Sequence, residues 1–377
     1  MNYRTHIVSS LSEIGRAAWD GLALAQPRPN PFLSYAFLDA LHESGSAAIE
    51  AGWQPQFIAL YDGAQLAAAL PMYVKMHSYG EYVFDWAWAD AYERNGLDYY
   101  PKLLSAIPFT PVTGPRLLAV DDAARAALIE VLVATQQATP VSSTHILYPP
   151  EEQAQLLAAA GYLLRSGVQF HWLNQGYKNF DEFLATLEHK KRKNIRAERR
   201  KVRDAGVTMR RVRGADAVDA DWQLFNRCYR HTYAAHRSTP YLNLDFFQRI
   251  GRDMPDNILL VIAERDGQAI AASLVIHSAQ VLYGRYWGEL EHVPCLHFEA
   301  AYYQPLEFCI EQGIAVFEGG AQGEHKMARG FLPTRTWSAH WLAQPAFADA
   351  IERFLEREKG GIDDYIDELN DRNPFKR

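Results

Sequence analysis

A short polar stretch at residues 318–331, EGGAQGEHKMARGF, brings together side chains that could do acid–base chemistry. The glycines before position 324 allow the backbone to approach a ligand closely and to adopt positive φ. The side chains that follow are a carboxylate, an imidazole and two cations: Glu324, His325, Lys326 and Arg329. On one turn, such a set can supply a general base, a general acid and a clamp for an anion. A plain polar loop is the alternative interpretation.

A second cluster lies in residues 285–299, RYWGELEHVPCLHFE, between an expected strand and an expected helix. Arg285, Trp287 and Gly288 fall in a partial match to the pyrophosphate signature of GNAT acetyltransferases, in which amides at a helix N-terminus hold phosphate. The match is incomplete, because Leu290 stands where the signature has Gly or Ala. We expect these residues to contact the phosphates of a donor.

Glu299 is a further candidate for acid–base catalysis, with a capping or core role as its alternative. The histidines and carboxylates of this region have no zinc-motif spacing, so no metal is expected. A metal-dependent enzyme that uses His297, Glu299 and His325 is kept as an alternative. The sequence has no GxSxG elbow, Walker loop or GxGxxG motif, which disfavours hydrolases, NTPases and dinucleotide enzymes.

Residues 189–203, HKKRKNIRAERRKVR, form a strongly basic segment that is expected to be a helix. Helical spacing places several arginines on one face and turns Ile195 toward the core. We expect Arg196, Arg199 and Arg200 to bind phosphate groups of a nucleotide, of coenzyme A or of the acceptor end of a tRNA. A solvated helix face balanced by acids elsewhere is the alternative.

Residues 84–94, FDWAWADAYER, interleave carboxylates with aromatic rings. Such a wall suits an amine or sugar acceptor through stacking and hydrogen bonds. An aromatic core with capping aspartates is the alternative. The residues that we expect to bind the acceptor are Asp85, Trp86, Trp88, Asp90, Tyr92 and, further along the chain, Arg116.

An internal repeat indicates how these clusters are positioned. Residues 56–70 (QFIALYDGAQLAAAL) and 260–274 (LVIAERDGQAIAASL) each read as two strands around an Asp-Gly turn, a strong hairpin signal. The blocks expected to follow are third strands at 82–86 and 283–287, helices starting at 99–104 and 302–307, and short strands at 111–114 and 315–319. This order is that of the GNAT fold. We therefore predict an α/β (α+β) protein with tandem duplicated GNAT-like domains, whose mixed, mostly antiparallel sheets are flanked by helices.

The domain boundary is expected near residues 150–160, where Pro149-Pro150 opens a helix. We predict residues 1–155 as an N-terminal, acceptor-side domain and residues 156–377 as a C-terminal, donor-side domain. The remaining expected elements are strands at 162–174 and 338–342 and a helix at 346–359.

Composition sets the broad class of the protein. The 377 residues, 48% hydrophobic and 22% charged, are typical of a globular protein of two domains. A net charge of −7 provides no general attraction to nucleic acid or anionic membrane, so a polyanion must meet a local patch. No signal peptide or membrane span is expected. Three cysteines without a CxxC pair are typical of a reducing compartment, and we expect a cytoplasmic location.

Long strings of the sequence resemble the FemAB-like family of predicted N-acyltransferases, often labelled peptidoglycan-biosynthesis proteins. They cover nearly the whole chain: NPFLSYAFLDALHESGS (30–46), FDWAWADAYERNGLDYYPKLLSAIPFTPVTGPRLL (84–118), VPCLHFEAAYYQ (293–304) and GAQGEHKMARGFLPTRTWSAHW (320–341). Residues 187–207 also resemble the basic helix of wider Fem-type transferases, which carry two GNAT units and move amino acids from aminoacyl-tRNA to peptidoglycan precursors. Ala301 stands where we expect a small thiol residue in many relatives, so no cysteine nucleophile is required here.

The resemblance implies an acyltransferase with an amine acceptor, and it leaves the donor open between acyl-CoA and aminoacyl-tRNA. No tightly bound cofactor is expected. We expect direct transfer without a covalent enzyme intermediate, with Glu324 or His325 accepting the amine proton. Lys326, Arg329 and Arg285 would neutralise donor phosphates. A non-catalytic module that binds cell-wall fragments or tRNA is the rival from another class.

Overall fold

The computed structural model describes residues 3–320 and 323–376, and the chain divides into two compact units. Unit 1 comprises Met1–Gly167 and Arg335–Tyr365, and unit 2 comprises Val168–Thr334 and Ile366–Arg377. The chain therefore passes from unit 1 to unit 2 after Gly167 and returns to unit 1 after Thr334. The functional division at residue 155 stays a prediction.

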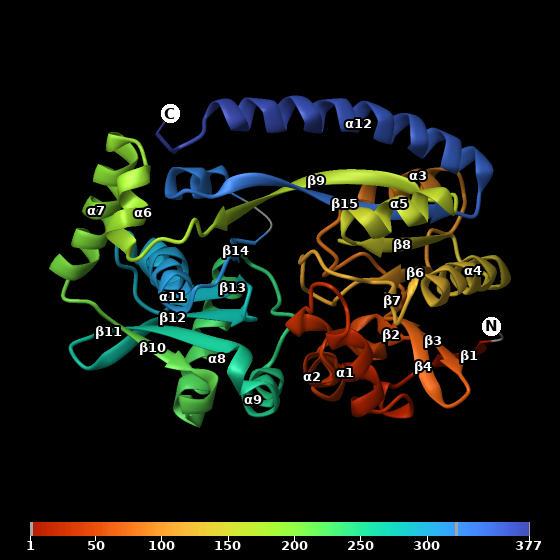
Figure 1. Ribbon diagram of the computed structural model, residues 1–377, viewed down its shortest axis with the longest axis horizontal. Coiled ribbons are helices and arrows are strands. Elements are labelled where there is room, and N and C mark those ends of the chain that lie inside the picture. Colours follow the sequence, from red (N-terminus) through yellow and green to blue (C-terminus); the bar gives the residue numbers. More distant parts are fainter. Residues whose placement is uncertain (1–2, 321–322, 377) are drawn as a thin grey trace. The chain divides into compact units, whose positions relative to one another are not determined.

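Unit 1 contains two groups of strands (Figure 1). A four-stranded sheet has the order β1-β3-β4-β7, and in the other group β15, β8, β6, β5 and β2 follow one another, with β6 and β8 parallel. The strands are β1 (Arg4–Val8), β2 (Trp53–Pro55), β3 (Phe57–Asp62), β4 (Gln65–Leu70), β5 (Tyr73–Lys75), β6 (Lys102–Ser105), β7 (Leu118–Ala119), β8 (Ser143–Leu147) and β15 (Leu332–Leu342). The helices are α1 (Arg16–Leu24), α2 (Tyr35–Glu43), α3 (Trp86–Arg94), α4 (Asp122–Ala138), α5 (Glu151–Ala159) and most of α12 (Pro345–Asp371).

Unit 2 is built on strands in the order β10-β11-β12-β13-β14-β9, antiparallel except for the parallel pair β13 and β14. The strands are β9 (Leu163–Leu173), β10 (Thr208–Arg213), β11 (Ile258–Arg265), β12 (Gln268–His277), β13 (Val281–Glu289) and β14 (Val316–Glu318). The helices are α6 (Phe180–Thr186), α7 (His189–Asp204), α8 (Asp219–Ala235), α9 (Leu244–Asp253), α10 (Leu296–Phe298), a π-helical turn (Glu299–Tyr303), α11 (Gln304–Gln312) and a 3-10 helix (Glu324–Arg329).

Both predicted Asp-Gly hairpins are present, as β3–β4 and β11–β12. In the second turn Asp266 and Gly267 have φ of 51° and 72°, the positive values that a type I′ turn requires. The helix at α7 and the strands at β9, β13, β14 and β15 are also confirmed. Unit 2 thus has the predicted GNAT-type order of three antiparallel strands, a crossover helix and a further strand.

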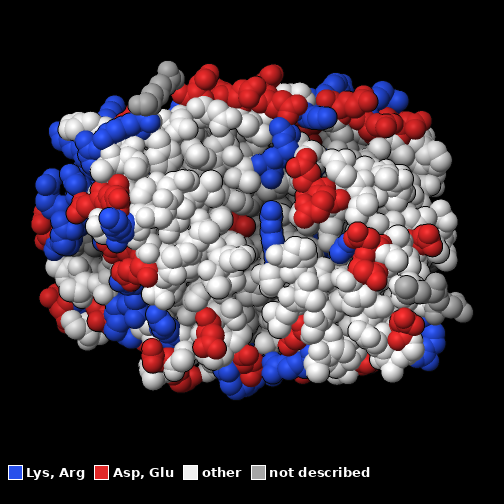
Figure 2. Space-filling view, in the orientation of Figure 1, with Lys and Arg blue, Asp and Glu red and all other residues white. Residues whose placement is uncertain are grey.

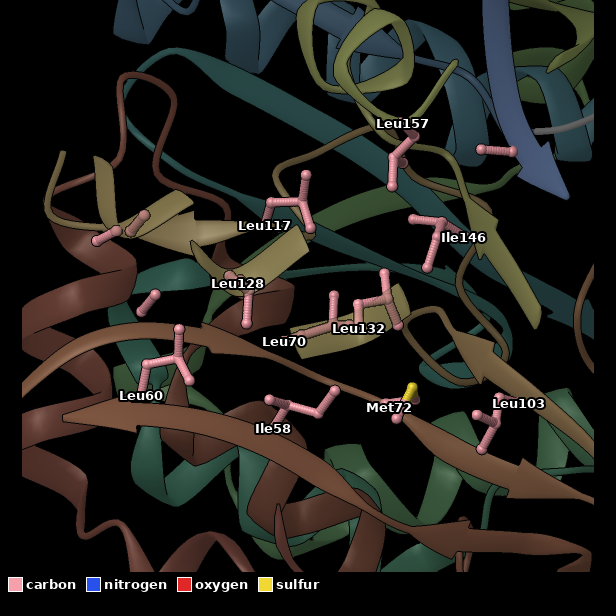
Figure 3. Packing of buried hydrophobic residues seen from close by; sticks show 14 of the residues in the cluster. Ile58, Leu60, Leu70, Met72, Leu103, Leu117, Leu128, Leu132, Ile146 and Leu157 are labelled. Atoms are coloured by element: carbon pink, nitrogen blue, oxygen red, sulfur yellow. The ribbon is translucent and has the colours of Figure 1, made fainter. Parts of the chain in front are cut away.

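The core of unit 1 lies between β3, β4 and α4 (Figure 3). Leu128 and Leu132 lie one turn apart on α4 and are fully buried against strand residues such as Ile58 and Leu70. Burying a side chain of this size contributes roughly 1.5–3 kcal/mol. Asp121 caps α4 by accepting a hydrogen bond of 2.7 Å from the Ala124 amide.

Three elements predicted for the first repeat were wrong. Residues 82–86 form no strand, because Gly80 and Tyr82 have left-handed φ of 81° and 61° and α3 then begins at Trp86. Residues 99–104 form no helix, because residues 102–105 pair with β5 and β8 as the buried strand β6. Residues 111–114 also form no strand. The crossover helix of this unit is α4, and its last strand is β8.

Among the helices formed by the described residues, none has both the length and the apolar character that crossing a membrane requires.

Candidate active site

In unit 2, β13 and β14 run parallel for a short distance and then part. Three residue pairs join them, and the last is Tyr283 opposite Glu318, where β14 ends. β13 continues to Glu289, and a β-bulge at Arg285 interrupts its pairing with β12. A bulge redirects backbone groups. The parting strands therefore give a place where a backbone amide of β13 can face a ligand.

Glu318 and His171 face each other beside this parting. They are direct cross-strand partners on β14 and β9, and Glu318 Oε2 lies 3.9 Å from His171 Nε2. Both side chains are buried, and neither of these two atoms has a hydrogen-bond partner in the described part of the chain. Burial raises the pKa of Glu318 to about 8, although the charge of Arg285 opposes this, and burial lowers the pKa of His171 to about 4. A buried carboxyl with such a pKa and with one oxygen available as an acceptor is suited to general base catalysis.

Lys326 adds a cation to the same region. Its ammonium donates a hydrogen bond of 2.9 Å to the carbonyl of Gly320, and burial lowers its pKa to about 8. Its charge further lowers the pKa of His171, behind the larger effect of burial. A Cβ added to Gly319 would lie 3.1 Å from Lys326 Cδ, so glycine allows the lysine to pass close to the backbone.

The other residues of the predicted loop lie in separate interactions. Glu324 is exposed and pairs with Arg372 at 3.0 Å. His325 Nε2 lies 3.3 Å from the Tyr302 hydroxyl. Arg329 is buried, with its guanidinium 3.4 Å from the centroid of the Phe298 ring. The structure therefore places Lys326, but not Glu324, close to the Glu318–His171 pair.

The partial pyrophosphate signature does not lie at a helix N-terminus. Arg285, Trp287 and Gly288 lie within β13, and the next helix begins only at Leu296. Gly288 has a packing role, because a Cβ there would lie 2.0 Å from the Cys228 carbonyl of α8. Contact of these residues with a donor stays a prediction.

Glu299 and the basic helix meet in a buried ion pair. Arg199 donates two hydrogen bonds to Glu299, of 2.9 and 3.0 Å, and one of 2.7 Å to Glu307. No group of three His, Cys, Asp or Glu side chains suited to hold a metal ion occurs among the residues that the structure describes.

The arginine groove is a cavity of about 420 Å³ along α7. Lys and Arg atoms gather where Figure 1 places this helix (Figure 2). On another side of α7, Ile195 and Val202 are buried, as helical spacing predicts. The groove is lined by Phe180, Asp181, Leu184, Arg196, Arg199, Arg200, Arg203 and Glu307. The structure thus brings the three predicted phosphate-binding arginines together.

In unit 1, Asp85 belongs to a buried charge cluster around Lys102. The Lys102 ammonium donates hydrogen bonds to Ser78 Oγ (2.7 Å), Glu81 Oε2 (2.8 Å) and Asp85 Oδ2 (2.5 Å). Burial raises the pKa of Glu81 to about 7. For Asp85, burial also acts to raise the pKa, but Lys102 outweighs it and holds the pKa below its usual range. Tyr99 donates a further hydrogen bond of 2.7 Å to Asp85.

The other predicted acceptor residues are not brought together as one wall. Trp86 is 41% exposed, whereas Trp88 and Tyr92 are buried. Asp90 is exposed and pairs with Arg94. Arg116 is fully buried and donates hydrogen bonds to the carbonyls of Val112 and Gly114, which secures the chain itself. A role of these residues in acceptor binding stays a prediction.

In unit 1, buried chain follows the parallel pair β6 and β8, whereas in unit 2 the strands β13 and β14 part. Beyond the last pair, Ser105 opposite Ile146, residues 106–112 are buried. The Gly114 amide then donates to the Tyr148 carbonyl at 3.0 Å, just after β8. The chain itself therefore occupies the position after the parallel pair in unit 1.

Comparison with known proteins accords with this geometry. A family model described as peptidoglycan biosynthesis/recognition matches residues 10–377. The chain belongs to the FemAB-like family. Curated protein sequences gave no significant match to this FemAB-like protein.

Solved structures share the fold at low sequence identity. FemX has a TM-score of 0.56 and 12% identity, over 93% of this chain and 100% of that one. The C-terminal domain of a putative lysylphosphatidylglycerol synthetase from Agrobacterium fabrum has a TM-score of 0.56 and 10% identity, over 92% and 96%. L-PGS from Bacillus licheniformis has a TM-score of 0.52 and 12% identity, over 87% and 97%.

Sequence analysis missed Glu318 and His171 of this FemAB-like protein. Glu318 ends an apolar strand directly before two glycines, and His171 lies in the apolar run of β9. A charged or titratable residue inside a predicted buried strand was the available signal. Their pairing depends on β9 and β14, which lie about 145 residues apart, and no local pattern reveals it.

Proposed function

We propose that this FemAB-like protein is an N-acyltransferase that moves an acyl or aminoacyl group from an activated donor to an amine, the amine belonging to a cell-wall precursor. The observation that carries the proposal is the buried carboxyl of Glu318 at the point where β13 and β14 part, whose Oε2 has no hydrogen-bond partner among the described residues. The family description, peptidoglycan biosynthesis/recognition, supports the choice of acceptor.

In the proposed reaction the amine nitrogen attacks the carbonyl carbon of a thioester or ester. Ionised Glu318 accepts the proton of the amine as the C–N bond forms. A backbone amide of β13 beyond Tyr283 donates to the developing oxyanion. The C–S or C–O bond then breaks, and the leaving thiolate or alkoxide takes the proton from Glu318.

Direct transfer agrees with the state of two of the three cysteines. Cys228 and Cys309 are buried, and burial raises the pKa of both thiols, that of Cys228 to about 11. Only the thiolate is a good nucleophile, so neither residue is suited to form an acyl-enzyme.

The donor phosphates would lie against the cations of unit 2. In this proposal Arg196 and Arg200 of the arginine groove and Lys326 bind them, with acyl-CoA or aminoacyl-tRNA as the donor. The donor is a co-substrate, and no tightly bound cofactor is invoked.

A panel of donors tests the proposal. Thermal stability is measured with acetyl-CoA, longer acyl-CoAs, coenzyme A and tRNA, and a donor at about 100 times its Kd should stabilise the fold by roughly 2.7 kcal/mol. The donor that binds is then assayed for amide formation with amine acceptors. Turnover lost in Glu318→Gln and kept in Glu311→Gln supports the proposal. Binding without turnover for any amine would favour the non-catalytic module.

A further inference from the structure

Two neighbouring side chains of α7 hold opposite ends of the π-helical turn Glu299–Tyr303. Arg199 donates two hydrogen bonds to Glu299 at the start of the turn, and Gln304 donates a third of 2.8 Å. Glu198 accepts a hydrogen bond from the Tyr303 hydroxyl at its end. A π-helical turn is an uncommon conformation that often marks functional regions. Here its geometry is tied to α7.

The same turn contacts the loop that carries His325. The Tyr302 hydroxyl lies 3.3 Å from His325 Nε2. Arg329 donates to the Tyr303 hydroxyl at 3.0 Å, to the His325 carbonyl at 2.7 Å and to both oxygens of Glu198. A movement of the turn must therefore change contacts of His325 and Arg329.

Arg199 also belongs to the arginine groove. Four arginines and two carboxylates line the groove, which leaves it positively charged. The described part of the chain places no carboxylate within ion-pair distance of Arg200 or Arg203, and both are exposed. A phosphate group bound by these two residues would reach Arg199 and compete with Glu299 and Glu307 for its guanidinium. Phosphate and carboxylate prefer the same two-pronged hydrogen bonding to arginine.

We propose that anion binding in the arginine groove is coupled to the 3-10 helix Glu324–Arg329 through Arg199, Glu299 and the π-helical turn. When phosphate draws Arg199 away from Glu299, the turn relaxes and the contacts of Tyr302 and Tyr303 with the loop change. Glu299 is thus a positioning residue. The coupling rests on the proposed function, because it takes the anion to be a phosphate of the donor. Binding of the donor would then adjust the loop that lies next to the reacting groups.

Inorganic pyrophosphate is the probe for this coupling. Its binding is followed by calorimetry, and the response of the loop by hydrogen exchange of residues 323–331 and by the imidazole NMR signals of His325, assigned with His325→Gln. In the wild-type protein both responses should saturate together with pyrophosphate binding. The double variant Arg200→Gln/Arg203→Gln should weaken binding by about tenfold or more, because it removes two charge-assisted contacts.

Glu299→Gln separates binding from coupling. The neutral amide frees Arg199, so pyrophosphate should bind about 5-fold or more tightly, which is the lower end of usual coupling between sites, while the response of residues 323–331 is lost. Glu311→Gln is the matched control, because Glu311 lies on α11, the helix that follows the turn, and pairs with Arg211. This variant should behave like the wild type.

Three outcomes overturn the coupling. Pyrophosphate binds and the loop does not respond; the response persists in Glu299→Gln; or pyrophosphate does not bind at low ionic strength. None of these readouts depends on turnover. Failure of the transferase proposal would appear instead in the Glu318→Gln assay, so the two failures are distinguishable.

Discussion

Glu318 Oε2 and His171 Nε2 lie 3.9 Å apart across the adjacent strands β14 and β9 of unit 2. This distance exceeds a hydrogen bond, so the carboxyl and the imidazole do not satisfy each other. Because both atoms also lack another partner in the described chain, each keeps its hydrogen-bonding capacity for a third group. In the proposed reaction that group is the attacking amine.

The rate of amide formation should rise with pH. Only the ionised form of Glu318 accepts a proton, and the pKa of about 8 places the ascending limb of kcat/KM near pH 8. Glu318→Gln should lower kcat/KM by about 10²–10⁴-fold. A pH–rate profile measured with the donor found in the binding panel tests both statements. A full rate in the variant, with circular dichroism showing it folded, would sink the assignment.

The contribution of Glu318 to stability should fall as pH rises through the same range. The folded pKa of Glu318 lies above its ordinary value of 4.5, so between about pH 4.5 and 8 the unfolded chain binds fewer protons than the folded one. The contribution of Glu318 to the free energy of unfolding then decreases as pH increases, and Glu318→Gln should remove this contribution from the curve. Urea titrations at several pH values measure it. Glu311→Gln serves as the control, since this carboxylate is half-exposed.

Loss of the Lys102 cation should strongly destabilise unit 1. Lys102→Met leaves Glu81 and Asp85 buried without a counter-charge, which costs about 3–5 kcal/mol. Lys102→Met/Asp85→Asn should cost less than the sum of the two single variants, because the charges compensate each other. Lys201→Met, at an exposed position of α7, should change the free energy of unfolding by no more than about 0.5 kcal/mol.

Acidification should loosen β8. His145 and His340 are buried and joined by a hydrogen bond of 2.7 Å between their Nδ1 atoms, so at least one ring is neutral. Burial lowers the pKa of both, that of His145 to about 3. The unfolded chain takes up protons below about pH 6.5 and the folded one does not, so stability is lost as pH falls below that value. Hydrogen exchange of residues 143–147 at pH 7 and pH 5 should show lost protection, and equal protection at both would contradict it.

Two glycine substitutions should have opposite effects. Gly288→Ala places a Cβ 2.0 Å from the Cys228 carbonyl, so α8 must shift, at a cost of about 1–3 kcal/mol. Gly360→Ala meets no atom within 4 Å on α12 and should stabilise by about 0.5–1 kcal/mol, because alanine favours the helix. Thermal unfolding of both variants tests the pair, and an unaffected Gly288→Ala would show that α8 is not so closely packed.

The sequence correctly predicted those elements whose structure is determined by neighbouring residues. The Asp-Gly turns were sufficient to predict both hairpins, and the spacing of Ile195 and Val202 was sufficient to predict the buried side of α7. It failed at residues 82–104, because the left-handed backbone of Gly80 and Tyr82 and the pairing of β6 with β5 and β8 decide the structure there, and the aromatic pattern reveals neither. For the site, the local Gly-rich loop was recognised but Glu318–His171 was not, since the pairing of β9 with β14 is not encoded near either residue.

The division of the chain has a consequence for its synthesis on the ribosome. Unit 1 is made of an N-terminal segment that ends at Gly167 and a segment that starts at Arg335, and β15 of that second segment pairs with β8. While the intervening residues emerge, β8 has an open edge that can recruit another nascent chain. Folding of unit 1 therefore cannot be completed before β15 has been synthesised, and a fragment ending near residue 155 would carry the same exposed edge permanently.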